Sequence, residues 1–162
     1  MDTLPDFADW YGRTYRSVLS SVMLATGADR SRAEDAVNDA FVTTYERWDR
    51  VGGLESPAAW VTKVAINNAK RNFRIRHRRI RQMQGLVPTA STDFEIDHDL
   101  WNAVRRLPRR QREALALRYV EDMSQAQIAE HLGIAEGTAA ASLNHARKNL
   151  KSHLSGECTD EQ

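Results

Sequence analysis

The residues best suited to a chemical task form a basic run, "KRNFRIRHRRIRQ" at residues 70–82, which holds seven Lys or Arg and no acid. A second basic group consists of Arg105, Arg106, Arg109, Arg110 and Arg112. The formal net charge of the chain is only +1, so these charges are concentrated locally. Concentrated guanidinium groups bind phosphate, which favours a nucleic-acid partner. The alternative is a solvated helix face, but such a face normally mixes charges of both signs.

Patterns typical of an enzyme are missing from the sequence. It contains no Gly-rich phosphate loop, no nucleophile elbow and no Cys/His set with zinc-ligand spacing. The acids Glu34 and Asp35 are adjacent, and a helix would separate them by about 100° instead of pairing them. The histidines are dispersed: His77, His98, His131, His145 and His153. We therefore predict a protein that is not an enzyme and needs no cofactor or metal.

The composition is that of an ordinary globular protein, with 41% hydrophobic and 28% charged residues. A length of 162 residues allows one domain or two small ones. No apolar run approaches the roughly 20 residues of a membrane span, and the start "MDTLPDFADW" does not resemble a signal peptide. Cys158 is the only cysteine, so no internal disulfide can form. These features predict a cytoplasmic protein without membrane insertion.

Helical periodicity predicts an all-α fold of two small helical domains joined by a flexible linker. In the first domain, residues 1–83, helices are expected over 6–25 and 31–48 and from Pro57 onward. Ser31 with Glu34 reads as a capping box, and Ser56 before Pro57 reads as a helix start. Trp48 and Trp60 are expected in the core.

The segment 84–97 is rich in Gly, Pro, Ser, Thr and acids without a period, which predicts the linker. The second domain is expected over 98–155, and the tail 156–162 is expected to be disordered. The predicted helices of the second domain cover 100–107, 109–120, 125–132 and 135–154.

The last two of these helices have cap and turn residues typical of a helix-turn-helix. Ser124 is expected to cap the first helix, Gly133 to permit the turn, and Leu143 and Ala146 to pack the second helix back. An unrelated αα-hairpin is the alternative. The start of the second helix of such a unit enters the major groove. Its candidate DNA contacts are Glu136, Thr138, Ala139, Ala140, Ser142 and His145, with Arg147, Lys148 and Lys151 suited to phosphate.

This reading helix is poorly equipped to distinguish base pairs. Bases are told apart mostly by Arg, Lys, Asn, Gln or Glu side chains, whereas alanine can only touch a thymine methyl group. Thr138 and Ser142 can form single hydrogen bonds. We therefore expect the helix to dock on DNA but to discriminate weakly, so that another part of the chain must add affinity or selectivity.

Two long blocks resemble bacterial RNA polymerase sigma factors of the extracytoplasmic-function (ECF) type, in the sigma-70 family. The first half is similar to region 2 in "RAEDAVNDAFVTTYERWD" and "SPAAWVTKVAINNAKRNFRIRHRR". The second half is similar to region 4 in "LWNAVRRLPRRQREALALRYVEDMSQAQIAEHLGIAEGT". Both blocks occur in the family's order. The second block alone also resembles the DNA-binding end of response-regulator activators.

The resemblance implies a protein that binds core RNA polymerase and directs promoter-specific initiation. Region 2 would melt the −10 element, and region 4 would hold the −35 element. It implies core-polymerase contacts at Asp35, Asn38, Asp39, Phe41 and Arg47. It places Lys63, Asn67 and Lys70 at the non-template strand, and Arg71, Arg74, Arg76 and Arg78 on upstream duplex phosphates. A regulatory partner such as an anti-sigma factor is common in the family and is expected here.

The sequence departs from the family pattern at the reading helix. Ala135 replaces the usual capping Ser, and Ala140 and Ser142 replace two usual basic residues. Asn38 replaces a usual Gln. Attachment to polymerase and a melted −10 site would raise the effective concentration of a weak reader. Two alternatives remain: a stand-alone helix-turn-helix regulator, and a sigma-like protein without promoter-melting activity.

Overall fold

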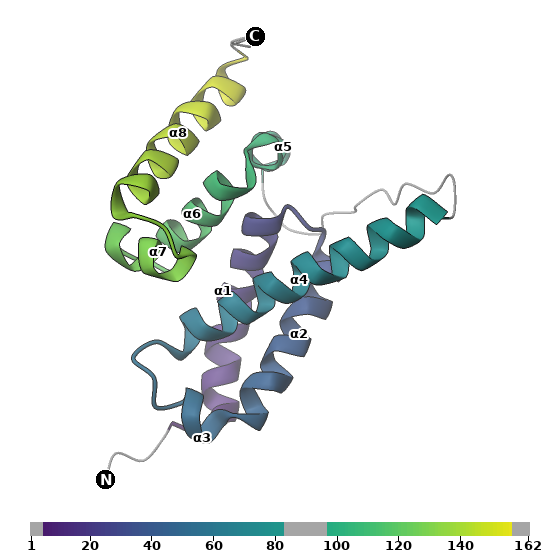
Figure 1. The fold of residues 1–162 in the computed structure, drawn as a ribbon, viewed down its shortest axis with the longest axis vertical. Helices are drawn as coiled ribbons and strands as arrows, with labels where there is room; N and C mark the ends of the chain where they lie inside the picture. Colours follow the sequence, from purple (N-terminus) through teal and green to yellow (C-terminus); the bar gives the residue numbers. More distant parts are fainter. Residues whose placement is uncertain (1–4, 83–96, 157–162) are drawn as a thin grey trace. The chain divides into compact units, whose positions relative to one another are not determined.

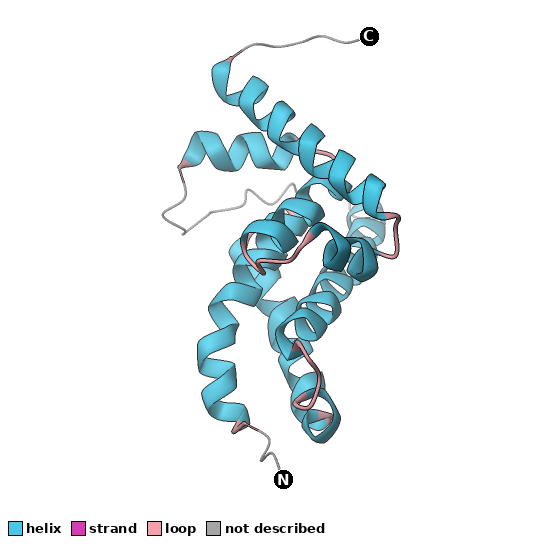
Figure 2. Cartoon of the chain, turned by 90° about the vertical axis from the view of Figure 1, so that its left-hand side faces the viewer, coloured by secondary structure: helices cyan, strands magenta, loops and turns pink. Residues whose placement is uncertain are grey.

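The computed structural model describes residues 5–82 and 97–156. These residues form helices joined by turns, with no strand (Figures 1 and 2). The predicted all-α class is confirmed. The predicted linker, apart from Asp97, and the predicted tail, apart from Gly156, lie outside the described residues. None of the described helices is long and apolar enough to cross a membrane.

The chain divides into two compact units, one built mainly from α1–α4 and the other mainly from α5–α8. The helices of the first unit are α1 (Phe7–Thr26), α2 (Arg30–Glu46), α3 (Trp48–Val51) and α4 (Pro57–Gln82). Those of the second unit are α5 (His98–Arg106), α6 (Arg109–Tyr119), α7 (Gln125–Leu132) and α8 (Glu136–Ser155).

In the first unit α2 packs against α4 (Figure 1), and several of the buried side chains on these two helices are small. Ala36 and Ala40 of α2 are fully buried, as is Ala65 of α4, and Ala69 is 9% exposed. Alanines allow two helix backbones to approach closely. Close approach also lets Asn68 Nδ2 of α4 donate a hydrogen bond to the Ala36 carbonyl at 3.4 Å.

Seven aromatic rings join α1 to α2 and α3, and we call them the aromatic cluster: Phe7, Trp10, Tyr11, Tyr15, Phe41, Tyr45 and Trp48. Phe41 has ring centroids at 4.9 Å from Tyr11 and 5.5 Å from Trp10. Tilted and edge-on aromatic pairs contribute beyond their buried area. The cluster therefore fixes α1 across α2, and Trp48 extends it by donating to the Pro5 carbonyl at 3.0 Å.

One predicted helix start is wrong and another is confirmed. Asp29, and not Ser31, is the N-cap of α2, where its side chain accepts from the backbone N–H of Arg32 at 2.9 Å. Glu34 then pairs with Arg30 at 2.6 Å instead of completing a capping box. The helix begins one residue before Ser31, because aspartate is as good a cap as serine. Ser56 does cap α4, accepting from the Ala59 N–H at 3.2 Å.

The helix-turn-helix of α7 and α8 has the predicted cap at Ser124 and the predicted turn at Gly133. Ser124 and Gln127 form a complete capping box at the start of α7. Gly133 has φ 65°, a left-handed conformation that glycine adopts without strain, and it ends α7. Ile128 and Leu143 are fully buried and close the core between the two helices. In contrast, Ala135 at the N-cap of α8 offers no side-chain hydrogen bond.

The two caps predict opposite stability changes. Ser124→Ala removes a side-chain acceptor from α7 and should destabilise the second unit by about 1 kcal/mol, whereas Ala135→Ser adds an acceptor to α8 and should stabilise it by about 0.5–1 kcal/mol. Hydrogen exchange of the α7 and α8 amides, measured in the full chain at several urea concentrations, gives both changes in stability. Shifts of the same sign in the two variants would contradict the assignment of the caps.

Candidate functional site

A polar stripe runs along α4 on the side turned away from α2. It consists of Lys63, Asn67, Lys70 and Arg74, at spacings of four, three and four residues. At about 100° per residue these positions share one helix face. Lys63, Asn67 and Arg74 are exposed and Lys70 is half-buried. The structure therefore brings the three predicted strand-contacting residues together with one predicted phosphate-binding arginine.

Beyond Lys70, the described side chains of α4 are exposed on every side of the helix. They include Arg71 and Arg78, and also Phe73, which is 61% exposed, and Ile75, which is 49% exposed. The helix itself continues to Gln82. The side chain of Arg76 lies outside the described residues. This basic extension offers guanidinium groups that are not buried by the bundle.

A second stripe lies on the exposed side of α2. Asp35, Asn38 and Asp39 are exposed as predicted, and the same face continues with Val42, 58% exposed, and Tyr45, 66% exposed. Sequence reasoning missed these last two residues, although their spacing from Asp35 and Asn38 is seven residues, which places them on the same face. The stripe thus joins negative charge to exposed apolar surface, a combination typical of a protein-binding face.

Two other predicted polymerase contacts lie differently. The side chain of Phe41 is only 3% exposed because it packs inside the aromatic cluster, so its contact with polymerase stays a prediction, for which this conformation offers little exposed side chain. It supports the α2 stripe from beneath. Arg47 is exposed in the turn between α2 and α3, beside the stripe.

The amide of Asn38 is oriented by α1. The Tyr15 hydroxyl donates to Asn38 Oδ1 at 3.1 Å. Burial raises the pKa of Tyr15, and the charge of Glu34 raises it further, so the hydroxyl keeps its proton. This hydrogen bond uses one of the two lone pairs of the oxygen, and the amide nitrogen of the exposed Asn38 remains a donor.

The reading helix α8 buries one row of small or apolar side chains, Ala139, Leu143 and Ala146. The opposite row consists of Ala141, Asn144 and Lys148, all exposed. Asn144 was missed by sequence reasoning, although an asparagine amide can pair with both N6 and N7 of adenine. The signal was its position five residues after Ala139, which places Asn144 about 140° around the helix from that buried residue.

The predicted DNA contacts on α8 are distributed around this outward row. Glu136, Thr138, His145 and Arg147 are exposed, whereas Ala140 and Ser142 are half-buried and Ala139 is fully buried. Ala139 is therefore corrected from a DNA contact to a core residue, because it packs in the same row as Leu143. The first two turns of α8 offer few polar groups to a base edge.

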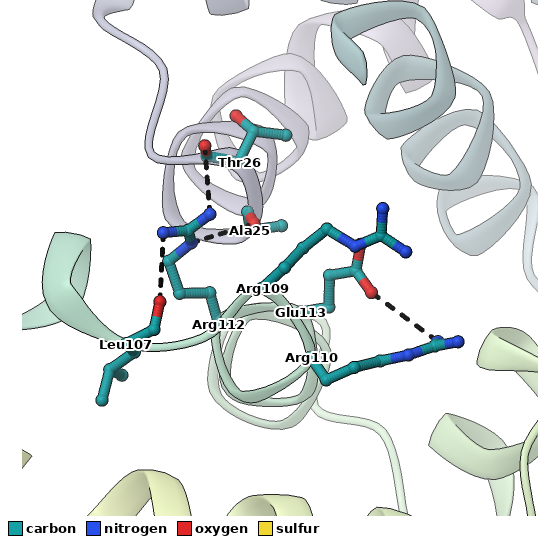
Figure 3. Close-up of polar contacts among 7 residues, drawn as sticks. All are labelled: Ala25, Thr26, Leu107, Arg109, Arg110, Arg112 and Glu113. Carbon is teal, nitrogen blue, oxygen red and sulfur yellow. Dashed lines mark hydrogen bonds and ion pairs between the residues drawn. The ribbon is translucent and has the colours of Figure 1, made fainter. Parts of the chain in front are cut away.

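The second basic group serves folding in part. Glu113 is 1% exposed and forms ion pairs with Arg109 at 3.5 Å and Arg110 at 3.9 Å (Figure 3). Arg112 Nη1 donates to the carbonyls of Arg105 and Leu107, each at 3.2 Å, at the end of α5. Such donors satisfy the carbonyls that a helix end leaves without partners.

Burial also lowers the pKa of the Arg112 guanidinium, although the charge of Glu113 opposes this shift. The Glu113 carboxylate thus offsets one positive charge of the second basic group, and the Arg112 guanidinium donates to main-chain carbonyls. The interpretation of all five arginines as a phosphate-binding cluster is therefore too simple; Arg105 and Arg106 remain exposed. Across residues 5–82 and 97–156, no group of three or more His, Cys, Asp or Glu could hold a metal ion.

Comparisons with known proteins agree with this geometry. The family model for sigma-70 region 2 matches residues 11–79, and the model for sigma-70 region 4 matches residues 97–150. The ECF RNA polymerase sigma factor SigL of Mycobacterium tuberculosis is 30% identical over 146 residues, which cover 85% of this chain and 82% of SigL. The RNA polymerase sigma-E factor of Streptomyces avermitilis is 28% identical over 155 residues, covering 93% and 86%.

A solved structure supports the fold. The sigma factor RpoE of Bartonella quintana, crystallised with the anti-sigma factor NepR, superimposes with a TM-score of 0.79 at 22% identity, covering 96% of this chain and 99% of that one. The region models and the sequence relatives lead to one conclusion: the chain belongs to the sigma-70 family of RNA polymerase sigma factors, in its extracytoplasmic-function group.

Proposed function

We propose that this protein binds core RNA polymerase in the cytoplasm and directs it to promoters, without catalysing a reaction itself. In this proposal the α2 stripe docks on polymerase, α4 opens the −10 element, and α8 anchors upstream DNA. The observation that carries the proposal is the α4 stripe, where the exposed Asn67 amide lies between Lys63 and Lys70.

The composition of the α4 stripe suits melted DNA. Opening a duplex and extruding a base costs a few kcal/mol, and binding the unstacked strand must recover that cost. Lys63 and Lys70 supply positive charge for the backbone, and Asn67 supplies both a donor and an acceptor for a base edge. The basic extension with Arg71, Arg74 and Arg78 would hold duplex phosphates upstream.

The α2 stripe has the opposite chemistry. Asp35 and Asp39 disfavour DNA on this face and favour a basic protein surface, and Val42 and Tyr45 add apolar area to bury. Because α2 and α4 present different outward faces, one small bundle can hold polymerase and promoter together.

The second unit would contribute affinity more than selectivity. Asn144 is the best base reader on the outward row of α8, and Lys148 and Lys151 are exposed cations for phosphate. A reader attached to polymerase gains effective concentration from the first unit, so weak discrimination is sufficient. The residues 84–97 would connect the two units through the polymerase.

A sigma-like or stand-alone helix-turn-helix regulator without melting activity is the second candidate function. The alanines at 139–141 favour it, because they leave the first turns of α8 with little to read bases. Run-off transcription with purified core polymerase separates the two functions: a regulator of this kind would produce no transcript.

A regulatory protein is a further expected partner. RpoE of Bartonella quintana, which shares this fold, was crystallised with the anti-sigma factor NepR. We propose that an anti-sigma factor also binds this chain and covers surface needed for polymerase or DNA.

Asn67→Ala should reduce the yield of open complex by about 10- to 100-fold, because it removes a base-edge partner while leaving charge and fold unchanged. Permanganate footprinting of the −10 region, with core affinity measured in parallel, checks this. Asn68→Ala is the matched control: Asn68 donates to the Ala36 carbonyl, so its loss should lower stability slightly and keep the open complex. A yield of open complex with Asn67→Ala equal to that of the wild type would reject the assignment.

Val42→Lys should weaken binding to core polymerase by about tenfold or more, because it places a positive charge in the apolar part of the α2 stripe. Fluorescence anisotropy of labelled protein with core enzyme measures the affinity. Gly12→Lys adds the same charge on α1, where an added Cβ meets no atom within 4 Å, and should leave the affinity unchanged. Equal losses in both variants would argue against a specific docking face.

Ala140→Lys should strengthen binding to promoter DNA and steepen its salt dependence by about one unit of log–log slope, because it adds one cation near phosphate. Ser142→Arg should act in the same direction. Holoenzyme affinity for duplex DNA at several salt concentrations provides the slopes. If the slopes match the wild-type value, these positions do not face phosphate.

A further inference from the structure

Tyr119, the last residue of α6, is a large exposed aromatic side chain that the proposed function leaves without a task. It is 61% exposed. Its hydroxyl oxygen accepts a hydrogen bond from Arg147 Nε of α8 at 2.8 Å. The guanidinium carbon of Arg147 also lies 5.8 Å from the centre of the Tyr119 ring, within the range of a cation–π contact. The pair thus joins α6 to α8 at the surface of the second unit.

Arg147 is held at a third point by its own helix. Its Nη1 donates to Asn144 Oδ1, one turn earlier, at 3.4 Å. These contacts engage Nε and Nη1, so Nη2 keeps two N–H groups to donate. The Tyr119 hydroxyl accepts from Arg147 and therefore still has its own proton to donate. Two adjacent donors, one of them charged, are consequently presented by side chains whose positions are already restricted.

We propose that Tyr119 and Arg147 form a binding site for a single backbone phosphate of the upstream promoter duplex. The Tyr119 O–H donates to one non-bridging oxygen of the phosphate, and Arg147 Nη2 donates to the other. This inference rests on the proposed function, in which α8 anchors upstream DNA. It adds a residue of α6 to that contact and assigns Tyr119 a direct role on DNA.

The charge of α8 supports phosphate as the ligand. From 137 to 155 the helix contains no acid, and Lys148 and Lys151 are exposed on it near Arg147. An arginine that is already oriented loses less side-chain entropy when it binds, so its hydrogen bond to phosphate is more favourable. Phosphate contacts position a reading helix without reading sequence. The site therefore sets the register in which Asn144 meets the bases.

A scan of neutral phosphates tests the site in the full chain bound to core polymerase. The DNA probe is a promoter recovered from a randomised library by the wild-type holoenzyme, with one methylphosphonate linkage placed at each upstream position in turn. A methylphosphonate removes one charge and one oxygen. We expect one linkage at which wild-type affinity falls, and at which Arg147→Ala shows no further fall.

Tyr119→Phe keeps the ring and its cation–π contact but loses the hydroxyl. It should weaken binding to the unmodified promoter by about three- to tenfold and reduce the effect of the same linkage. The double variant with Arg147→Ala should bind no worse than Arg147→Ala alone. Arg147→Lys, which keeps the charge but not the fork, should resemble Arg147→Ala at that linkage. Tyr11→Phe removes a hydroxyl from the first unit and should leave the scan unchanged.

Two results would overturn the site: a Tyr119→Phe scan identical to the wild-type scan, or additive losses in the double variant. Thermal unfolding of Tyr119→Phe that matches the wild type excludes a folding defect as the cause of weaker binding. A wild-type holoenzyme that selects no promoter from the library would refute both the proposed function and this inference. A wild type that selects and melts a promoter, with an unaffected Tyr119→Phe, would refute this inference alone.

Discussion

The close packing of α2 against α4 is the contact on which both functional faces of the first unit depend. A helix buries one stripe of side chains and exposes the opposite one. Ala36 and Ala65 are fully buried, and Asn68 of α4 reaches the Ala36 carbonyl across the contact, so both helices are held with little space between them. This contact fixes the rotation of each helix about its axis. The acidic and apolar stripe of α2 and the basic stripe of α4 are exposed as a consequence.

The aromatic cluster completes this arrangement and separates supporting residues from contacting residues. Phe41 is a large apolar residue of the kind that often contacts a partner protein, but it lies under the surface, where it contacts aromatic rings of α1. The next residue, Val42, is exposed instead, because one residue along a helix corresponds to a rotation of about 100°. The apolar part of the α2 stripe is therefore displaced by one position from the residue that family resemblance suggests. The rings beneath it support the stripe, and in the proposed docking on polymerase this support would reduce the entropy lost on binding.

In the second unit, charge is divided between folding and DNA binding. Glu113 is buried beside Arg109 and Arg110, and Arg112 is occupied by carbonyls at the end of α5. Burying an unpaired carboxylate is costly, so these two ion pairs stabilise Glu113 in its buried position. Exposed lysines suited to phosphate, Lys148 and Lys151, lie on α8 after its alanine-rich start. The unit is consequently better suited to hold a duplex than to read it, which is consistent with anchoring by a subunit attached to polymerase.

The sequence by itself determined the helical class, most helix bounds to within one or two residues and the helix-turn-helix, whereas the family resemblance indicated Lys63, Asn67 and Lys70 of α4. The class, the bounds and the helix-turn-helix follow from interactions between residues that are close in the sequence. Examples are the period of apolar residues, the helix cap at Ser124 and the left-handed conformation of Gly133. Only the tertiary structure decided that Phe41 and Ala139 are buried, that Val42 and Asn144 are exposed, and that Arg147 meets Tyr119, which precedes it by 28 residues. The physical reason is that burial and long-range hydrogen bonds depend on which helix faces pack together, and a helical period places residues on a face without stating what that face meets.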